Sequence, residues 1–453
     1  MAINVIGVMT GNSLDAVDVV LTVFDKGMIK DLAAYTLPYP QELRDKLLKL
    51  RALIKEKKSE MAEIVKDEAF EKVINEYTTL VAKAVNKLFN DSGFDKKNVA
   101  AIGFHGQTCD HFPPSIAKGQ PAYTLQVGNP QLLADLTDLP VIYDFRSDDI
   151  MNGGEGAPLA PLHNLHIAEV LKRRGVLSMA FCNGGNTGNI AVISQAKDVI
   201  LPEVVGWDTG PFNHFPDKLM RDYKNLPCDK DGEFGKKGVV QSKLLKKLFD
   251  NAAVTNYGSN FYNQQPPRSS DPNWYNLIYD NEFSFEDNLR TAEYLSAYTY
   301  VYSLNFVQKH FLMPSLYLLF GGGWKNPLIK KDFEELLTGN GIILPEHEKT
   351  FADIWRRIPK PITIDWADNY GFSGEYMEAR IFADMAYCKI INEPFSIPST
   401  TNCRTPTIGG IFVYPQNNKK YLLEQLLLNN NNQATSEKEV LLWSRSITCI
   451  MGI

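Results

Sequence analysis

The sequence predicts an α/β protein of two lobes, and three observations carry this prediction. Apolar runs typical of strands end in glycine-rich turns, and stretches with helical periodicity lie between these runs. The third observation is length: 453 residues exceed the usual size of one hydrophobic core, so two or more lobes are expected. A cleft between lobes is a natural place for a ligand, which favours an enzyme over a small binding module.

Each element follows from a local pattern. Strands are predicted at residues 3–8, 17–24, 99–104, 176–182 and 316–320, and helices within residues 40–84 and 283–311. A polar turn at residues 10–15 joins the first two strands, which predicts a β-hairpin. Proline, glycine and serine clusters between residues 228 and 272 predict loops, and the asparagine-containing tail beyond Pro415 predicts an appended helix or partial disorder. No internal repeat is visible.

Composition excludes several classes of protein. Hydrophobic residues at 44% and charged residues at 22% are ordinary for a globular chain. The net charge of −6, with both signs interspersed, does not suggest a nucleic-acid partner. The six cysteines form no C-x-x-C pair, so free thiols in a reducing compartment are expected. No apolar run reaches the ~20 residues that span a bilayer. We expect a cytoplasmic protein without a membrane partner, and the oligomeric state stays open, a homodimer included.

Three glycine-rich turns are suited to phosphate groups, because phosphoryl transfer needs backbone donors, a cation and a positioned nucleophile. The first turn is G-V-M-T-G-N-S-L-D-A-V-D at residues 7–18, where Asp15 is suited to hold Mg²⁺ through water. The second contains Gly184 and Gly185 after a strand, and the third contains Gly321, Gly322 and Gly323, whose backbone suits a flat ring such as adenine. For each turn the alternative is a connector without a ligand.

A single carboxylate stands in the stiff turn G-W-D-T-G-P-F-N at residues 206–213. With an ordinary pKa of ~3.9, Asp208 is ionised at neutral pH and needs only correct placement to act as a general base. The alternative is an acid that caps an Asx-turn.

Two further segments set polar side chains among glycines, H-G-Q-T at residues 105–108 and D-F-R at residues 144–146. Arg146 can fork onto a carboxylate or a phosphate, and the rival interpretation is a structural salt bridge to Asp144 or Asp149. His163 and His166 form an H-x-x-H pair, but the sequence suggests no third ligand, so we expect no metal there.

In order along the chain, these segments resemble the anhydro-N-acetylmuramic acid kinase family up to about Pro415. The opening turn matches the family's G-x-M-S-G-T-S-x-D-G-x-D, residues 105–108 its H-G-Q-T, and residues 144–158 its D-F-R-x-x-D followed by G-G-x-G-A-P. Residues 208–213 match D-T-G-P-G-N, residues 266–269 P-P-K-S, and residues 321–327 G-G-G-x-x-N-P. Glu378, Ala379, Phe382 and Ala383 fit an E-A-x-x-F-A helix.

The resemblance implies an actin/hexokinase-like kinase fold with an interlobe cleft. The N-terminal lobe would be residues 1–146 plus about 392–453, and the C-terminal lobe residues 147–391. The family uses ATP and Mg²⁺ to open 1,6-anhydro-N-acetylmuramic acid with water and to phosphorylate O6. Asp208 would activate the water, and Asp15 would hold the metal. Sugar contacts would come from His105, Gln107, Arg146 and Glu378. The nucleotide contacts would be Gly11, Asn12, Ser13, Leu14, Asp15, Ala16, Val17, Asp18, Gly184, Gly185, Gly321, Gly322, Gly323 and Asn326.

Three positions depart from the family pattern. Asn12 replaces a threonine, Ala16 a glycine and Phe212 another glycine. Ala16 would be strained if that position needed a positive φ, and Phe212 would narrow the pocket or stack on a sugar. Two alternatives therefore stay open: a kinase for another anhydro-sugar such as levoglucosan, and a catalytically weak relative that binds nucleotide or sugar.

Overall fold

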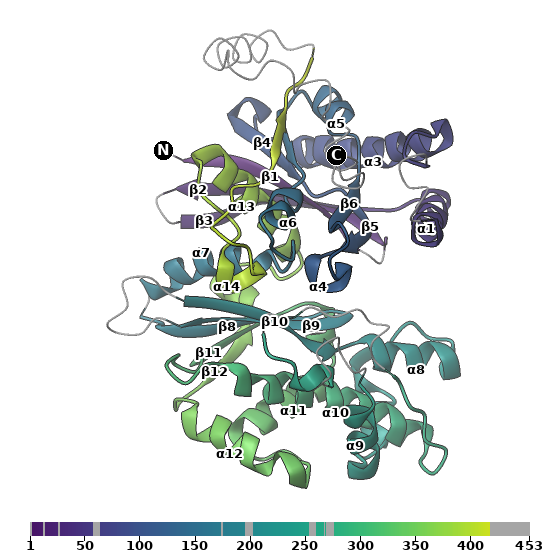
Figure 1. The fold of residues 1–453 in the computed structure, drawn as a ribbon, viewed down its shortest axis with the longest axis vertical. Helices are drawn as coiled ribbons and strands as arrows, with labels where there is room; N and C mark the ends of the chain where they lie inside the picture. The colour runs from purple at the N-terminus through teal and green to yellow at the C-terminus, as the bar shows by residue number, and fades with distance from the viewer. Residues whose placement is uncertain are drawn as a thin grey trace. The chain divides into compact units, whose positions relative to one another are not determined.

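The computed structural model describes most of the chain, which forms two compact units (Figure 1). The described residues are 2–11, 14–25, 28–57, 64–173, 175–194, 203–252, 260–266, 268 and 276–416. Unit 1 is Met1–His163 and Tyr376–Ile453, and unit 2 is Asn164–Glu375. The boundaries predicted after residues 146 and 391 lie elsewhere, because residues 147–163 and 376–391 belong to unit 1.

Unit 1 is built on a mixed six-stranded sheet in the order β13-β7-β4-β1-β2-β3. Its strands are β1 (Ile3–Thr10), β2 (Ala16–Asp25), β3 (Met28–Pro38), β4 (Val99–Phe104), β7 (Val141–Tyr143) and β13 (Ile411–Val413), with β5 (Gln107–Phe112) and β6 (Tyr123–Val127) forming a separate pair. Its helices are α1 (Gln41–Glu56), α3 (Glu68–Ser92), η2 (Lys96–Asn98), α4 (Pro114–Ala117), α5 (Pro130–Thr137), α6 (Ser147–Met151), α13 (Met377–Ile391) and α14 (Pro398–Thr401). The predicted hairpin is confirmed, because β1 and β2 pair in antiparallel fashion.

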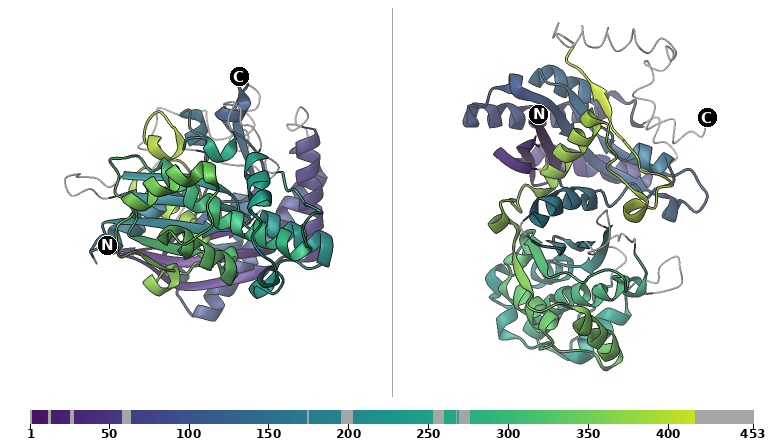
Figure 2. Two further views of the ribbon diagram at one scale, coloured as in Figure 1. Left: turned by 90° about the horizontal axis from the view of Figure 1, so that it is seen from below. Right: turned by 90° about the vertical axis from the view of Figure 1, so that its left-hand side faces the viewer.

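Glycines in two neighbouring strands let α13 pack very closely on this sheet. Gly7 of β1 lies opposite Gly103 of β4. A Cβ on Gly7 would lie 1.9 Å from the carbonyl oxygen of Ala379, and one on Gly103 would lie 2.1 Å from that of Phe382. Figure 2 shows the same proximity as yellow-green α13 against the purple strands. Side chains alternate along a strand, so Ile6 points to the opposite face, where the core of α1 and α3 lies.

Unit 2 is built on a five-stranded sheet in the order β10-β9-β8-β11-β12. The strands are β8 (Ser178–Gly184), β9 (Thr187–Ser194), β10 (Glu203–Pro211), β11 (Leu316–Phe320) and β12 (Thr363–Trp366). The helices are α8 (His214–Lys224), η3 (Lys230–Gly232), η4 (Gly235–Lys237), α9 (Ser242–Asp250), η5 (Phe261–Asn263), α10 (Phe285–Ser303), η7 (Leu304–Phe306), η8 (Gly322–Lys325), α11 (Pro327–Thr338), η9 (Pro345–His347), α12 (Glu348–Arg357) and η10 (Ala367–Tyr370). A last helix, α7 (Ala160–Lys172), contains the boundary between the units.

The two sheets share one topology that is not apparent in the sequence. In each unit three consecutive strands pair antiparallel, and two later strands add in parallel beside the first strand of the three. The order β3-β2-β1-β4-β7 in unit 1 thus matches β10-β9-β8-β11-β12 in unit 2. The chain therefore contains a structural repeat, although no sequence repeat was found.

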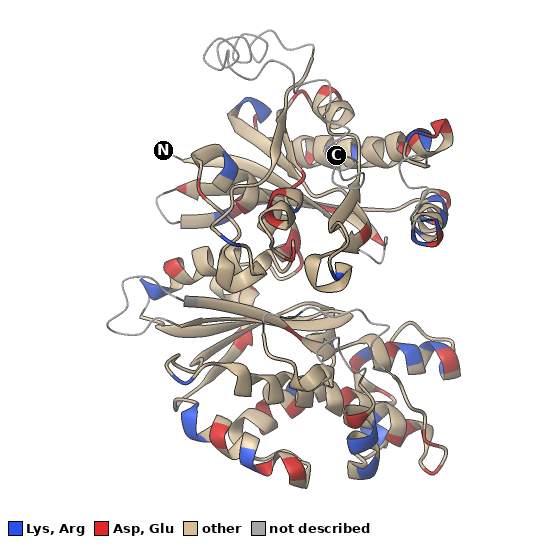
Figure 3. Cartoon of the chain, viewed as in Figure 1, with Lys and Arg blue, Asp and Glu red and all other residues tan. Residues whose placement is uncertain are grey.

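The outer helices of unit 2 carry many of its charges. Lys, Arg, Asp and Glu gather on α8, α9, α11 and α12, whereas β8 and β9 carry none (Figure 3). Helix α10 is buried along almost its whole length and lies in the centre of the hydrophobic core. Within the described ranges, no helix is both long and apolar enough to cross a membrane.

One prediction for this unit was wrong. The segment expected to form loops contains α9, which buries Leu244, Leu245 and Leu248 on one face. That spacing is the helical pattern itself, but the turn-forming residues on both sides obscured it. The tail beyond residue 416 lies outside the described residues, so its prediction is untested.

Candidate active site

The opening turn of unit 1 is held by local hydrogen bonds. Leu14 N–H donates to the carbonyl oxygen of Gly11 at 3.2 Å, and Asp15 Oδ1 accepts from the N–H of Ala16 at 3.1 Å. Leu14 has φ of 55° and is the strained residue of the turn, with its side chain buried. Ala16 instead begins β2 and pairs with Pro38, so alanine replaces the family's glycine there without strain. Asn12 and Ser13 lie outside the described residues.

Three carboxylates of unit 1 influence one another near this turn. Asp15 is exposed, and Asp18 accepts a hydrogen bond from Thr36 Oγ1 at 2.7 Å. Glu378 lies in the first turn of α13. Its side chain is open to solvent, yet the dense protein around it, then Asp18 and Asp15, raise its pKa, while Arg146 lowers it. Carboxylate oxygens of this kind are the ligands that Mg²⁺ prefers.

Arg146 is fixed by two hydrogen-bond acceptors other than the predicted carboxylates. Its Nε and Nη2 lie 3.2 and 3.1 Å from His105 Nε2, and its Nη1 donates to the carbonyl oxygen of Gly156 at 2.6 Å. No hydrogen bond joins it to Asp144 or Asp149 in the described part of unit 1, although the charge of Asp149 raises the pKa of Arg146. Burial lowers the pKa of Arg146 to about 10, so the guanidinium remains charged at neutral pH. Burial and the adjacent Arg146 lower the pKa of His105, so the imidazole is neutral.

Asp149 orders the glycine loop that holds Arg146, a role that was not predicted. Its carboxylate accepts from Gly156 N–H and from Thr401 Oγ1, each at 2.7 Å. A Cβ on Gly154 would lie 2.2 Å from Asp149 Oδ2, which explains the glycine at that position. Asp149 is 1% exposed and acts on Arg146 in two ways. Its hydrogen bond to Gly156 orders the loop that holds Arg146, and its negative charge raises the pKa of Arg146.

Gln107 offers an unused acceptor beside the opening turn. Its side chain is 2% exposed, and Nε2 donates to the carbonyl oxygen of Gly11 at 3.4 Å. Among the described residues no donor reaches Oε1. A buried amide oxygen without a donor is costly, so this atom suits a hydroxyl or amide N–H of a ligand.

Asp208 stands at an irregularity in β10. The register against β9 shifts between Asp208 and Gly210, as in a β-bulge, a device that re-aims side chains near active sites. Both backbone groups of Asp208 are held by Arg268, whose carbonyl oxygen accepts from Asp208 N–H at 3.0 Å and whose Nε donates to the Asp208 carbonyl oxygen at 2.9 Å. Asp208 itself is partly buried. Nearby, burial, Cys182 and Asp208 raise the pKa of Tyr300.

The second and third glycine turns are neighbours in unit 2. Phe320 of β11 pairs with Asn183 of β8, and a Cβ on Gly321 would lie 2.8 Å from the carbonyl oxygen of Gly184. Gly321 has φ of 94°, which favours glycine. Gly322 is exposed and has no atom within 4 Å of a Cβ position, so its backbone is open to a ligand.

Phe212 lies underneath these turns and does not line an open surface. Its ring is 0% exposed and meets Trp324 edge-on at a centroid distance of 4.6 Å and Tyr300 at 5.8 Å. A Cβ on Gly184 would lie 2.8 Å from the Phe212 ring. Both expectations for Phe212, narrowing a pocket or stacking on a sugar, are therefore wrong, because the ring fills the core.

We expect Phe212→Ala to lower the free energy of unfolding by about 3–5 kcal/mol, since it empties a fully packed site. Urea denaturation followed by tryptophan fluorescence measures this loss. Val239→Ala, at a side chain that is 62% exposed in the same unit, is the control and should change stability by less than about 0.5 kcal/mol. A similar small change for Phe212→Ala would contradict the packing described.

Asn326 acts as the N-cap of α11. Its Oδ1 accepts from Leu328 N–H at 2.9 Å, and its Nδ2 donates to Glu293 Oε1 at 2.8 Å. The predicted nucleotide contact of this residue is therefore untested, whereas its structural role is evident.

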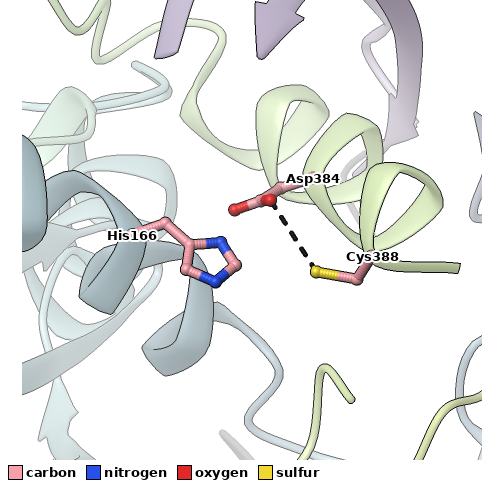
Figure 4. Close-up of side chains that lie close together, drawn as sticks. All are labelled: His166, Asp384 and Cys388. Atoms are coloured by element: carbon pink, nitrogen blue, oxygen red, sulfur yellow. Dashed lines mark hydrogen bonds between the residues drawn. The ribbon is translucent and has the colours of Figure 1, made fainter. Parts of the chain in front are cut away.

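His163 belongs to a buried pair in unit 1. Its Nδ1 donates to Asp384 Oδ2 at 2.7 Å, and Cys388 Sγ lies 3.9 Å from Asp384 Oδ1, one turn further along α13 (Figure 4). The first histidine of the H-x-x-H pair thus joins α7 to α13. Figure 4 draws Asp384 and Cys388 with His166, the second histidine of the pair, which belongs to unit 2.

The structure gathers the predicted residues into two sets, one in each unit. Unit 1 holds the opening turn with His105, Gln107, Arg146 and Glu378, and unit 2 holds Asp208 with the two other glycine turns. Glycine turns, a cation-suited group of carboxylates and a fixed aspartate are the parts required for phosphoryl transfer, so fold and site define an α/β enzyme of that class.

Comparison with known proteins gives the family. The model of the anhydro-N-acetylmuramic acid kinase family matches residues 3–349, and this chain belongs to that family. The anhydro-N-acetylmuramic acid kinase of Haemophilus influenzae is 30% identical over 429 residues, covering 90% of this chain and 97% of that protein. Its counterpart in Idiomarina loihiensis is 30% identical over 419 residues, covering 91% and 99%.

Solved structures of sugar kinases are more distant. A ROK hexokinase from Thermus thermophilus has a TM-score of 0.34 and 14% identity, covering 86% of this chain and all of that one. A xylulose kinase from Lactobacillus acidophilus has a TM-score of 0.34 and 11% identity, covering 96% and 99%. The predicted α/β class and the division of the chain into two units are confirmed.

Proposed function

We propose that this chain is an ATP-dependent cytoplasmic kinase that opens 1,6-anhydro-N-acetylmuramic acid with water and phosphorylates O6. The products would be N-acetylmuramic acid 6-phosphate and ADP, as in the recycling of cell-wall sugar. Membership of the family supports the reaction. The observation that carries the proposal is Asp208, whose segment resembles the family's D-T-G-P-G-N motif and whose backbone is fixed on both sides by Arg268.

In the proposed mechanism Asp208 takes a proton from water as that water attacks the anomeric carbon. The bond between this carbon and O6 breaks, and O6 accepts the γ-phosphoryl group. Arg268 keeps the Asp208 backbone in place, so the carboxylate needs no reorganisation during the reaction.

Arg146 is the proposed partner of the lactyl carboxylate of the sugar. Three of its five N–H groups are used by His105 and Gly156, which leaves two for a ligand. Because those hydrogen bonds hold the guanidinium plane, a carboxylate would meet a preorganised fork. Gln107 Oε1 and Glu378 would take hydroxyl or amide groups of the sugar.

ATP and Mg²⁺ fit different groups of residues. The exposed Gly322 and its neighbours are suited to adenosine, and the opening turn to phosphates. Asp15 and Asp18 supply the hard oxygen ligands that Mg²⁺ requires and would hold it with water. When bound, Mg²⁺ supplies positive charge that balances the phosphate oxygens.

The test is a product assay with 1,6-anhydro-N-acetylmuramic acid, ATP and Mg²⁺, followed by mass spectrometry. We expect the sugar to gain one water and one phosphoryl group. Levoglucosan lacks the lactyl acid and should react with a kcat/KM lower by at least about 10²-fold, because Arg146 would lose its partner. Faster turnover of levoglucosan would favour the alternative substrate.

Two of the three sequence departures that suggested a catalytically weak relative no longer support that alternative. Ala16 lies in extended backbone and Phe212 in the core of unit 2. Asn12 is the remaining departure and lies outside the described residues. Tight ATP binding without turnover of either sugar would revive this alternative.

A further inference from the structure

Glu293 is a carboxyl group buried in the core of unit 2. It lies on α10 and is 0% exposed. Asn326 Nδ2 donates to Oε1 at 2.8 Å, whereas no hydrogen-bond donor reaches Oε2 within the described ranges. A Cβ on Gly235 would lie 2.1 Å from Oε2, so only glycine allows the chain to pass there. An ionised carboxylate with a single neutral donor would be very costly at such a site.

A neighbouring carboxyl group, Asp229, explains why Oε2 of Glu293 has no donor. Its carboxylate accepts N–H groups of Phe234 at 3.0 Å and Gly235 at 2.8 Å, so Asp229 has two backbone donors where Glu293 has one side-chain donor. Two adjacent carboxyl groups do not both ionise in a buried site, and one proton is shared between them. Glu293, which has fewer donors, is the member that keeps the proton.

Asn326 links Glu293 to the third glycine turn. Its N–H donates to the carbonyl oxygen of Gly323 at 3.1 Å, while its side chain caps α11. Gly323 in turn packs on Phe212 and Asn213, where a Cβ would lie 2.5 Å from either side chain. The end of the turn at residues 321–326 is therefore held from α10 by one side-chain hydrogen bond.

We propose that Glu293 is a positioning residue that, in its neutral form, holds Asn326 and so shapes the turn at residues 321–326 for the adenosine of ATP. This inference rests on the proposed function, which assigns that turn to the nucleotide. Glu293 itself touches no substrate. Its proton points to Asp229, and Oε1 stays free to accept from Asn326.

The electrostatic surroundings of Glu293 support this assignment. Burial, then the charge of Asp229, raise the pKa of Glu293 well above its ordinary value of 4.5, while Asn326 and Arg290 act in the opposite direction. Arg290 is engaged elsewhere, because its Nη1 and Nη2 donate to the two oxygens of Asp332 at 2.7 and 2.5 Å. Asp229, Arg290 and Asn326 are the groups around the carboxyl.

Calorimetric titration of the full chain with ATP in the absence of sugar tests the proposal. Glu293→Gln keeps a neutral acceptor for Asn326 and a donor for Asp229, so we expect ATP affinity within about twofold of wild type. Glu293→Ala removes the anchor and should weaken ATP binding on the order of tenfold. Asn326→Ala alone should weaken ATP binding at least as much as Glu293→Ala, because it removes both the hydrogen bond to Glu293 and the N-cap of α11.

Leu295→Ala is the matched control, because it also removes a buried side chain of α10. It should destabilise unit 2 while ATP affinity stays unchanged. Equal losses of ATP affinity in Glu293→Ala and Leu295→Ala would mean that Glu293 only fills space in the core. Equal losses in Glu293→Gln and Glu293→Ala would mean that a neutral side chain at this position does not hold Asn326. Wild-type ATP binding without sugar phosphorylation would defeat the proposed function alone.

The dependence of the unfolding free energy on pH gives a second test of the proposal. The folded protein retains a proton on Glu293 that the unfolded chain loses above pH 4.5, so wild type loses unfolding free energy as the pH rises from there. Glu293→Gln lacks this slope. In urea denaturation between pH 5 and 8, the stability of the variant relative to wild type should increase with pH. Parallel curves would show that Glu293 is ionised and would overturn the proposal.

Discussion

Asp208→Asn should lower kcat for the anhydro-sugar by about 10²- to 10⁴-fold, the range expected when a general base is lost. The amide has the shape of the carboxylate but cannot take the proton of the attacking water. Both hydrogen bonds between Arg268 and the backbone of residue 208 persist in the variant, so the turn keeps its form. KM for ATP and the midpoint of urea denaturation should therefore stay close to wild type.

The measurement is steady-state phosphorylation monitored by ADP release, with the sugar identified by mass spectrometry. Asp222→Asn is the control, because this exposed residue of the same unit is paired with Lys218 on the surface of α8. The control should retain full activity. If Asp208→Asn turned over at the wild-type rate, Asp208 would have no part in the mechanism.

Gly103→Val should destabilise the protein by about 3 kcal/mol or more, the upper end of the cost of overpacking. The added Cβ would lie 2.1 Å from the carbonyl oxygen of Phe382, which belongs to the backbone of α13 and has no rotamer with which to yield. The helix must move away from the sheet, and Glu378 at its first turn moves with it. We expect a lower urea midpoint and a higher KM for the sugar.

Gly322→Ala serves as the stability control for this substitution. No atom lies within 4 Å of the added methyl group, so the free energy of unfolding should change by less than about 0.5 kcal/mol. An unchanged urea midpoint for Gly103→Val would mean that α13 does not pack on β4 as closely as described.

Local patterns in the sequence were sufficient for most elements. The strands at residues 99–104 and 316–320 were predicted to the residue, because their apolar runs end in glycine turns. The lobe boundaries were misplaced for a different reason. Helix α13 belongs to unit 1 through Gly7 and Gly103, and contacts between residues so far apart leave no local signature.

In the candidate site, too, local motifs were predicted and contacts between distant residues were not. Motifs indicated Asp208 and Arg146, but not the hydrogen bonds that hold them. Gly156 acts through its backbone carbonyl oxygen, and Arg268 acts through its backbone carbonyl oxygen and its side-chain Nε. Leu14 was predicted as a nucleotide contact, but its positive φ was not, because leucine seldom adopts that conformation and here the buried side chain holds it. Glu293 was missed because a lone glutamate in a helix is usually a surface residue.

Unit 1 is assembled from both ends of the described chain, with all of unit 2 inserted between them. During synthesis, β1 and β4 leave the ribosome more than two hundred residues before α13, the helix that fits over their glycines. The face of the amino-terminal sheet that α13 covers therefore lacks this helix during synthesis of the inserted unit. That unit is one continuous segment and can fold before α13 is made.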